Sequence, residues 1–175
     1  YTINKGKKAK QYTEPISMRD GGTVTAWFAN NPSIKTTTTF KKLETIQTEV
    51  IYASSEEVGD GDAKNLVDGD PATYWHSMYS VTVAKYPHWV DLDAGEVKTI
   101  KGFTYMPRQD SYNGNVKEYT IHVSMDGKNW GEPVQKGTFA GNRDEKKVIF
   151  SQPVKGRYIR FTALSEQYGQ DYASG

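Results

Sequence analysis

Oxygen-bearing side chains are concentrated in residues 54–71, which contain two Asp-Gly-Asp triplets at 60–62 and 68–70. Residues 65–73 combine carboxylates, an amide and a hydroxyl with the carbonyls of a turn-rich backbone. Calcium binds about six to eight such oxygens in a flexible arrangement. The stretch therefore has the chemistry of a calcium loop. The alternative is a metal-free turn, because Asp and Asn form Asx turns unaided.

Aromatic residues make up 13% of the chain, with 12 Tyr and 4 Trp. Tyr and Trp combine an apolar face with a polar edge, so half-exposed rings suit stacking on flat ligands or on sugar rings. Aromatic residues are also common in the strands of β-sandwiches, so composition leaves both roles open. We expect Trp75 and Trp130 in the core rather than in a ligand platform.

The charge balance argues against a nucleic-acid partner. The chain carries 22 basic and 21 acidic residues, a net charge of +1, which builds no strongly positive field. A membrane span is not expected either, because no apolar run reaches about 18 residues. The absence of cysteine excludes disulfides, thiolate zinc sites and cysteine nucleophiles.

Catalysis is not expected. Asp91 and Asp93 form the one notable carboxylate pair in a strand-like segment, but alternate residues of a strand point to the same face. Glycosidases need two carboxyl groups across the scissile bond. No Gly-x-Ser-x-Gly, His-Glu-x-x-His or glycine-rich phosphate loop occurs. We therefore expect a binding module and not an enzyme.

Short apolar alternations bounded by turn residues predict an all-β chain without an amphipathic helix. Asp126-Gly127 is a strong hairpin signal. The spacing favours an antiparallel β-sandwich of about eight strands. The expected strands cover residues 23–28, 36–40, 49–52, 88–93, 99–106, 116–125, 147–150 and 157–161.

Two domains are expected. Residues 1–45 hold three strands at most, which are too few to close a sandwich, so they are interpreted as part of a small β-domain. Residues 46–175 are enough for one self-contained core. The chain opens Tyr-Thr-Ile-Asn, which indicates that it begins inside a longer polypeptide.

Four ordered stretches carry a resemblance to a known family: AKNLVDGDPATYWHS at 63–77, GFTYMPRQD at 102–110 followed by NGNVKEY at 113–119, SMDGKNW at 124–130, and RYIRF at 157–161. They resemble the discoidin family, also called coagulation factor 5/8 type C, and most closely the family 32 carbohydrate-binding modules of bacterial glycosidases. The resemblance runs from about residue 48 to residue 175. It implies a discoidin-like jelly roll.

The first part of the chain carries a second, shorter resemblance. Residues 12–18, residues 22–26 and Phe40 are similar to the small β-domain that follows the catalytic domain of chitobiases and other β-hexosaminidases. The similarity starts within that domain, so residues 1–45 are expected to be a partial copy of it.

The discoidin resemblance implies a sugar site at one end of the sandwich. His76 and Arg108 match the side chains that hydrogen-bond hydroxyls, and Tyr79 matches an aromatic position that is often Trp. The amide of the family site matches Asn113 or Asn115. This set suits a pyranose, because C–H bonds on one face of the ring pack on an aromatic side chain while Arg reaches two vicinal oxygens. Two further candidates lie in the same loop, Asp110 and Tyr112.

The resemblance also implies a structural calcium ion. Its ligands would be the Asn65 carbonyl, the Asp68 carboxylate, the Asp70 carbonyl and both oxygens of Thr73. Family members add an Ala-Glu pair near the C-terminus. The sequence reads Ala-Ser-Gly at 173–175, so we expect that the last ligand either lies beyond residue 175 or is replaced by Ala173 together with water.

The implied function is that of a non-catalytic accessory module that holds a parent glycoside hydrolase on terminal galactose- or hexosamine-type sugars. Such a module would be secreted, periplasmic or on the surface of a bacterium, monomeric, and covalently attached to its catalytic domain. Two alternatives are a structural spacer and a protein- or membrane-binding discoidin domain. The polar loop tips expected at 59–61 and 111–113, and the absence of cysteine, argue against the membrane-binding type.

Overall fold

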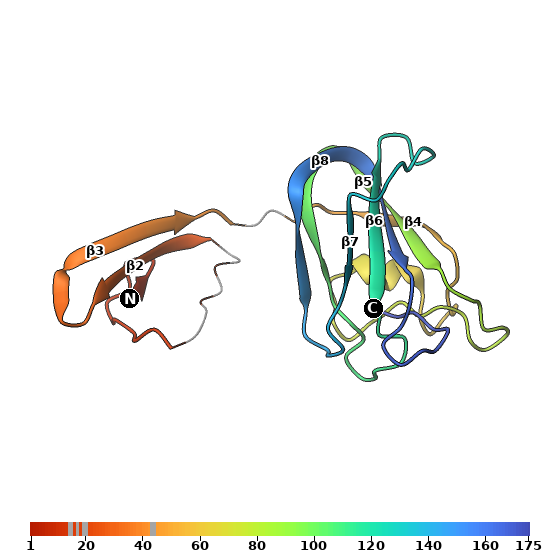
Figure 1. Ribbon diagram of the computed structural model, residues 1–175, viewed down its shortest axis with the longest axis horizontal. Helices are drawn as coiled ribbons and strands as arrows, with labels where there is room; N and C mark the ends of the chain where they lie inside the picture. Colours follow the sequence, from red (N-terminus) through yellow and green to blue (C-terminus); the bar gives the residue numbers. More distant parts are fainter. Residues whose placement is uncertain (14–15, 17, 19–20, 43–44) are drawn as a thin grey trace. The chain divides into compact units, whose positions relative to one another are not determined.

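The computed structural model describes residues 1–13, 16, 18, 21–42 and 45–175. The chain divides into two compact units, Tyr1–Thr45 and Ile46–Gly175 (Figure 1). Residues 14, 15 and 17 of the chitobiase-like segment lie outside the described residues.

The first unit is one antiparallel sheet in which β2 (Gly22–Phe28) lies between β1 (Thr2–Ile3) and β3 (Asn31–Phe40). The β2–β3 pair has a ladder of threonines, and the hydroxyls of Thr23 and Thr39 are 3.0 Å apart. β1 was not expected, and β3 begins earlier than the 36–40 segment. None of the described residues of this unit is buried, so the sheet encloses no core of its own.

The second unit has a five-stranded antiparallel sheet in the order β4-β5-β8-β6-β7. β6 is shorter than the 116–125 segment expected, and β7 was not expected at all. The strand bounds are β4 Glu49–Ala53, β5 His88–Tyr105, β6 Glu118–Ser124, β7 Gln135–Thr138 and β8 Lys146–Ala163.

Two long strands produce the layers of the second unit. The 88–93 and 99–106 segments are parts of β5, and the 147–150 and 157–161 segments are parts of β8. The segments expected as separate strands are continuous, because the residues between them form irregularities, with register shifts between Asp93 and Lys98 and between Ile100 and Gly102. A bulge bends a strand without ending it, and Figure 1 shows β5 and β8 curving together.

The core lies between the two halves of these bent strands. Phe103 from the second half of β5 stands edge-on to Tyr119 of β6 at 5.6 Å, and Tyr105 stacks on Phe161 of β8 at the same separation. Trp75 is fully buried, as expected. Trp130 is not part of this core: it is partly exposed and lies against Arg160.

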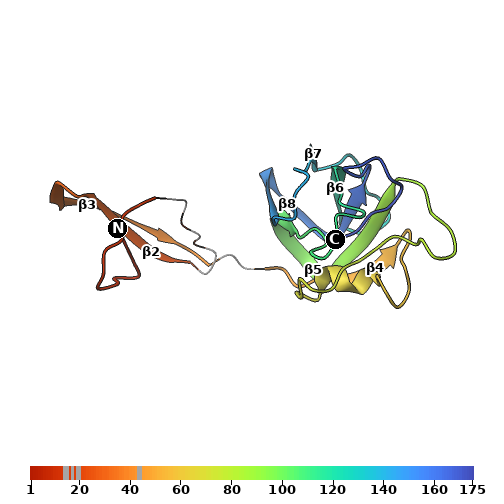
Figure 2. The ribbon, with the colours of Figure 1, turned by 90° about the horizontal axis from the view of Figure 1, so that it is seen from below.

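The polar loop before Trp75 contains a short 3-10 helix, η1 (Ala63–Val67), which was not expected. It contacts β4, beside which it lies in Figure 2. The end of the described chain returns to this region, because the amide of Trp75 donates to the Gly175 carbonyl at 2.8 Å and the amide of Gly175 donates back at 3.1 Å. This pairing brings the C-terminal segment beside the loops that carry the expected site.

Candidate functional site

His76 is held at the centre of the site by its backbone. Its amide donates to the Gly61 carbonyl at 3.0 Å, and its carbonyl accepts from the Glu57 amide at 2.8 Å. On its other edge it forms a β-bridge with Ser174. The residue has no exposed surface, at 0%, so its orientation is fixed by the fold.

The hydrogen bonds of the His76 ring identify its tautomer. Nδ1 lies 2.6 Å from the Ser77 carbonyl oxygen, which can only accept, so Nδ1 carries the proton. Nε2 is then an acceptor, and the Asn113 amide donates to it at 3.4 Å. That distance is at the long end for a hydrogen bond. Burial lowers the pKa of His76 and keeps the ring neutral at pH 7.

Tyr79 stands edge-on to the His76 ring, with the ring centres 5.0 Å apart. Its hydroxyl donates to Asp60 Oδ2 at 2.7 Å, which raises the pKa of Tyr79. Its backbone amide donates to Glu57 Oε2 at 2.7 Å. The Ser80 hydroxyl also donates to Glu57, and together these bonds hold the pKa of Glu57 below its usual value. The two loops that carry Asp60 and Tyr79 are therefore joined.

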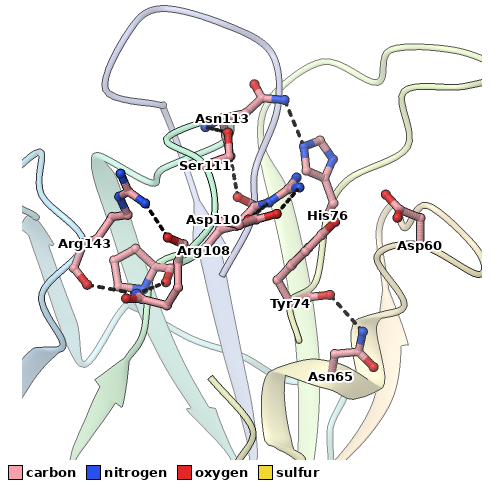
Figure 3. Close-up of polar contacts among 12 residues, drawn as sticks. Asp60, Asn65, Tyr74, His76, Arg108, Asp110, Ser111, Asn113 and Arg143 are labelled. Atoms are coloured by element: carbon pink, nitrogen blue, oxygen red, sulfur yellow. Dashed lines mark hydrogen bonds and ion pairs between the residues drawn. The ribbon is translucent and has the colours of Figure 1, made fainter. Parts of the chain in front are cut away.

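Arg108 follows β5 and lies on the other side of His76 from Asp60 (Figure 3). Its guanidinium covers the Tyr74 ring at 3.8 Å from the ring centre. Nε donates to Asp110 Oδ1 at 2.5 Å and Nη2 to Asp110 Oδ2 at 3.0 Å, which lowers the pKa of Asp110. The Arg108 side chain is 16% exposed and that of Asp110 is 63% exposed.

The structure brings some of the expected side chains together and separates others. Asn113 contacts His76, whereas Asn115 is buried and its amide donates to the Asn142 carbonyl at 3.3 Å. Asn113 is therefore the amide of this group. Tyr112 is exposed, its ring stands edge-on to that of Tyr168, and it lies under the guanidinium of Arg143.

Sequence reasoning missed four members of the group, one of which is Tyr172, whose ring centre lies 5.6 Å from that of His76. Asp60 and Glu57 fix the position of Tyr79, and Tyr74 supports Arg108. Asp60 belongs to the first Asp-Gly-Asp triplet, which was noted only as part of a polar stretch. A signal was present, because a carboxylate in a loop that precedes an expected ligand-binding histidine is a candidate acceptor for hydroxyls.

The loop tips around this group are less polar than expected. Val58 is 76% exposed in the turn next to Asp60, and Val81 is 85% exposed just after Tyr79. The expectation of polar tips considered residues 59–61 and 111–113 and left these valines out.

Three of the oxygens expected to bind calcium lie close together around Thr73. Its hydroxyl lies 2.7 Å from Asp68 Oδ2 and 2.9 Å from the Asp70 carbonyl. The amide of Asp70 donates to Asp68 Oδ1 at 2.8 Å, and Asn65 donates through its side chain to the Tyr74 carbonyl at 2.9 Å. A carboxylate, a carbonyl and a hydroxyl within hydrogen-bond distance of one another form a donor set that fits calcium.

The backbone of Ala173 pairs with Ser77. Its carbonyl accepts from the Ser77 amide at 2.8 Å, and its amide donates to the Ser77 hydroxyl at 3.0 Å. The pairing of Trp75 with Gly175 continues this register. Within the part of the chain that the structure describes, no group of three or more His, Asp or Glu side chains could hold a metal ion.

The two carboxylates considered for acid–base chemistry are engaged elsewhere. Asp91 receives two hydrogen bonds from Arg160, at 2.6 and 2.7 Å, and Asp93 receives two from Arg157, both at 2.7 Å. Each is half of a fork-like ion pair on β5 and β8. The pairs hold the sheet together. Both carboxylates of this part of β5 are therefore already paired with arginines and are not free to act beside the His76 group.

Comparison with known proteins identifies the family of the chain. Residues 50–175 match the family model described as F5/8 type C domain. A sialidase of Micromonospora viridifaciens is 39% identical over 166 residues, which is 93% of this chain and 25% of that protein. A galactose oxidase of Gibberella zeae is 31% identical over 115 residues, or 65% of this chain and 17% of that protein. The chain thus spans a quarter or less of these relatives.

Solved structures match the second unit. CpGH89CBM32-5 from Clostridium perfringens, in complex with GalNAc-β-1,3-galactose, is 32% identical, with a TM-score of 0.66, and covers 73% of this chain and 90% of its own. The family 32 CBM from C. perfringens NanJ, in complex with galactose, is 27% identical, with a TM-score of 0.64, covering 73% and 88%. The C-terminal domain of a Bacteroides fragilis chitobiase, 23% identical with a TM-score of 0.65 and covering 75% and 91%, shares the fold.

Proposed function

The chain belongs to the F5/8 type C family, and we propose that residues 46–175 are a non-catalytic carbohydrate-binding module that holds a parent glycoside hydrolase on terminal galactose- or hexosamine-type sugars. Two similar structures are complexes with galactose and with GalNAc-β-1,3-galactose. The similar proteins include a sialidase and a lacto-N-biosidase, which are much longer than this chain. The sialidase similarity covers more of the chain than residues 46–175 alone provide, so it extends into the first unit.

The observation that carries the proposal is the arrangement around His76. A neutral ring offers Nε2 as an acceptor, the Arg108 guanidinium offers donors on one side, and the exposed Tyr79 ring packs against the His76 ring. Donors, an acceptor and an aromatic surface on a rigid sandwich are the groups that a pyranose requires.

The present geometry requires one movement on binding. His76 has no exposed surface, and Asn113 covers its Nε2 through the 3.4 Å hydrogen bond. A sugar hydroxyl can replace this long bond with a shorter one and then bind the displaced Asn113 amide as well. We therefore place Asn113 in the site as a side chain that turns towards the ligand.

Binding of one terminal sugar will be weak, on the order of 0.1–1 mM, because a shallow site buries little area and such constants correspond to only about 4–5.5 kcal/mol. Attachment to a catalytic domain raises the effective concentration of the module near its glycan. The module is proposed to act as a monomer in a secreted, periplasmic or cell-surface bacterial protein.

An NMR titration with galactose, N-acetylgalactosamine and N-acetylglucosamine tests the proposal. We expect shifts clustered at residues 76–79 and 108–113, and the loss of those shifts in Arg108→Ala. Lys101→Ala removes one exposed positive charge from β5 and is the matched control that keeps binding. Shifts that cluster elsewhere, or none with any of the three sugars, would contradict the proposed site.

We further propose that residues 65–73 bind one calcium ion through the Asn65 and Asp70 carbonyls, the Asp68 carboxylate and both oxygens of Thr73. The close approach of the Asp68, Asp70 and Thr73 oxygens supports this. Calcium would tie η1 to the segment that leads into Trp75 and would hold that side of the sugar site. Calorimetric titration of the chain with calcium should show one site, and the absence of binding heat would overturn the proposal.

A second candidate function is contact with a protein or a membrane surface. The exposed Val58 and Val81 at the loop tips favour it. Among the described residues, no helix is long and apolar enough to cross a membrane. Co-sedimentation with liposomes separates this candidate from the sugar module, for which we expect no bound fraction.

A further inference from the structure

The charged groups around His76 are unevenly distributed. Asp60 lies on one side of the ring, and its carboxylate accepts a hydrogen bond from the neutral hydroxyl of Tyr79, at 2.7 Å. Glu57 lies on the same side and receives two backbone amides and the Ser80 hydroxyl. Within the described parts of the chain, neither carboxylate forms an ion pair with Lys or Arg.

The other side of His76 carries charges of both signs. The charge of Arg108 is matched by Asp110 through two hydrogen bonds. Arg143 lies beyond this pair, where its guanidinium covers the Tyr112 ring. Figure 3 shows Arg143 and Asp110 away from Asp60, with His76 between the two sides. The Asp60 side of His76, with Asp60 and Glu57, is therefore negative, whereas the Arg108 side carries charges of both signs.

We propose that this site selects uncharged sugars and rejects sugars with anionic substituents, such as uronic acids and sulfated galactose, and that Asp60 is the specificity-determining residue. The inference rests on the proposed sugar-binding function. Asp60 accepts hydrogen bonds only, so it favours a ligand that presents hydroxyl donors. It repels a carboxylate or a sulfate.

The expected selectivity follows from Coulomb's law. Two like charges about 6 Å apart in water repel by about 0.7 kcal/mol, which is about a threefold loss of affinity for each carboxylate so placed. A pyranose is small, so a charged substituent on any of its carbons stays within the Debye length of about 10 Å at 0.1 M salt. Asp60 therefore acts on charges at either edge of the ring.

Affinities of the full chain for galactose, galacturonic acid and galactose 3-sulfate test this inference by NMR titration at low salt. The two acidic sugars carry their charge on different sides of the ring. We expect both to bind at least about threefold more weakly than galactose. Asp60→Asn keeps an oxygen for the Tyr79 hydroxyl but removes the charge. It should reduce the ratio of galactose affinity to acidic-sugar affinity by about threefold. Glu132→Gln removes an exposed charge from the β6–β7 connection and should leave this affinity ratio unchanged.

The outcomes separate the two proposals. If no neutral sugar binds, the proposed function fails and the selectivity fails with it. If galactose binds but either acidic sugar binds as tightly, only the selectivity is overturned. If the affinity ratio is unchanged in Asp60→Asn, or changes equally in Glu132→Gln, Asp60 does not determine the specificity.

Discussion

Two arginines of the second unit use the same contacts in different surroundings. Arg160 forms two hydrogen bonds with Asp91, and Arg108 forms two with Asp110. Each guanidinium also lies over an aromatic ring. Arg160 contacts two tryptophans, at 4.3 Å from the centre of the Trp130 ring and 5.5 Å from that of a second ring in β5. Arg108 contacts one ring, and its partner Asp110 is mostly exposed.

The difference teaches how to separate a supporting arginine from a binding one. The Asp91 side chain is only 9% exposed, so the Arg160 pair joins β5 to β8 and offers little surface to a ligand. The exposed Asp110 leaves its pair open to competition, since a sugar hydroxyl can replace a carboxylate oxygen at the guanidinium. A bidentate pair alone therefore does not distinguish a supporting arginine from a binding one. The exposure of its carboxylate makes that distinction.

The largest expected effect is on stability. Asp91→Asn leaves the Arg160 charge without its partner between two tryptophans, and removing one partner of a buried pair costs about 3 kcal/mol. Asp110→Asn makes the same chemical change in an exposed pair and should cost less than about 1 kcal/mol. Urea denaturation of both variants measures the two free energies of unfolding. Equal losses would break the distinction between the two regions.

A second test extends the comparison to the loop beside the site. If calcium binds at residues 65–73, the free energy of unfolding rises by about 2.7 kcal/mol when free calcium reaches 100 times its dissociation constant. Asp68→Asn should remove most of this gain, whereas Asp126→Asn, in the hairpin after β6, should retain it. Thermal unfolding with calcium and with a chelator measures the gain. A chelator that leaves the wild-type midpoint unchanged would contradict the calcium proposal.

The strand-rich fold could be predicted because turn residues and alternating segments are local features of the sequence. The continuity of β5 and β8 could not, because residues such as Gly95 are used both to end strands and to bend them. The choice depends on whether the partner strand bends too. Pairing across both sides of the bend decides it here, and such pairing joins distant parts of the chain.

The candidate site was also only partly predictable, because some of its residues lie in local sequence motifs and others are brought together by the fold. His76 and Arg108 belong to ordered motifs, and Tyr79 follows the first of these motifs by two residues, so a resemblance could suggest all three as candidates. Asp60 and Tyr74 enter the site through a hydrogen bond and a ring contact that only the folded loops create. Asn115 was a reasonable alternative to Asn113 in the sequence, but the β-bridge of Asn115 with Ser174 places it in the interior.

A third test measures ligand binding instead of stability. Arg108→Ala should weaken sugar binding by at least about tenfold, a loss of about 1.4 kcal/mol, with little change in the free energy of unfolding. Arg160→Ala should do the reverse, because it lies outside the His76 group and supports the sheet. NMR titration of the folded fraction of each variant gives the affinities. Sugar binding that is lost in both variants, or in neither, would break the comparison.

The smallest effect expected is the dependence of binding on pH, and it distinguishes the two sides of the site. Burial lowers the pKa of His76 below the usual 6.5, so the ring stays neutral at and above that pH and Nε2 remains an acceptor. Protonation would turn Nε2 into a donor. We therefore expect sugar affinity to be constant from pH 8 to 6.5 and to fall only as pH drops through the lowered pKa.

The free energy of unfolding is expected to fall with decreasing pH in the same way as the sugar affinity. The unfolded histidine takes up a proton near pH 6.5 while the folded one resists, so the contribution of the buried neutral ring is complete above pH 6.5 and is lost as the pH falls further. The Nε2 chemical shift of His76 followed by NMR, with and without galactose, gives the folded pKa directly. Galactose should lower that pKa further, because it binds the neutral form. A midpoint above 6.5, or one that galactose raises, would mean that the charged ring binds the sugar and that Arg108 and His76 do not act as donor and acceptor.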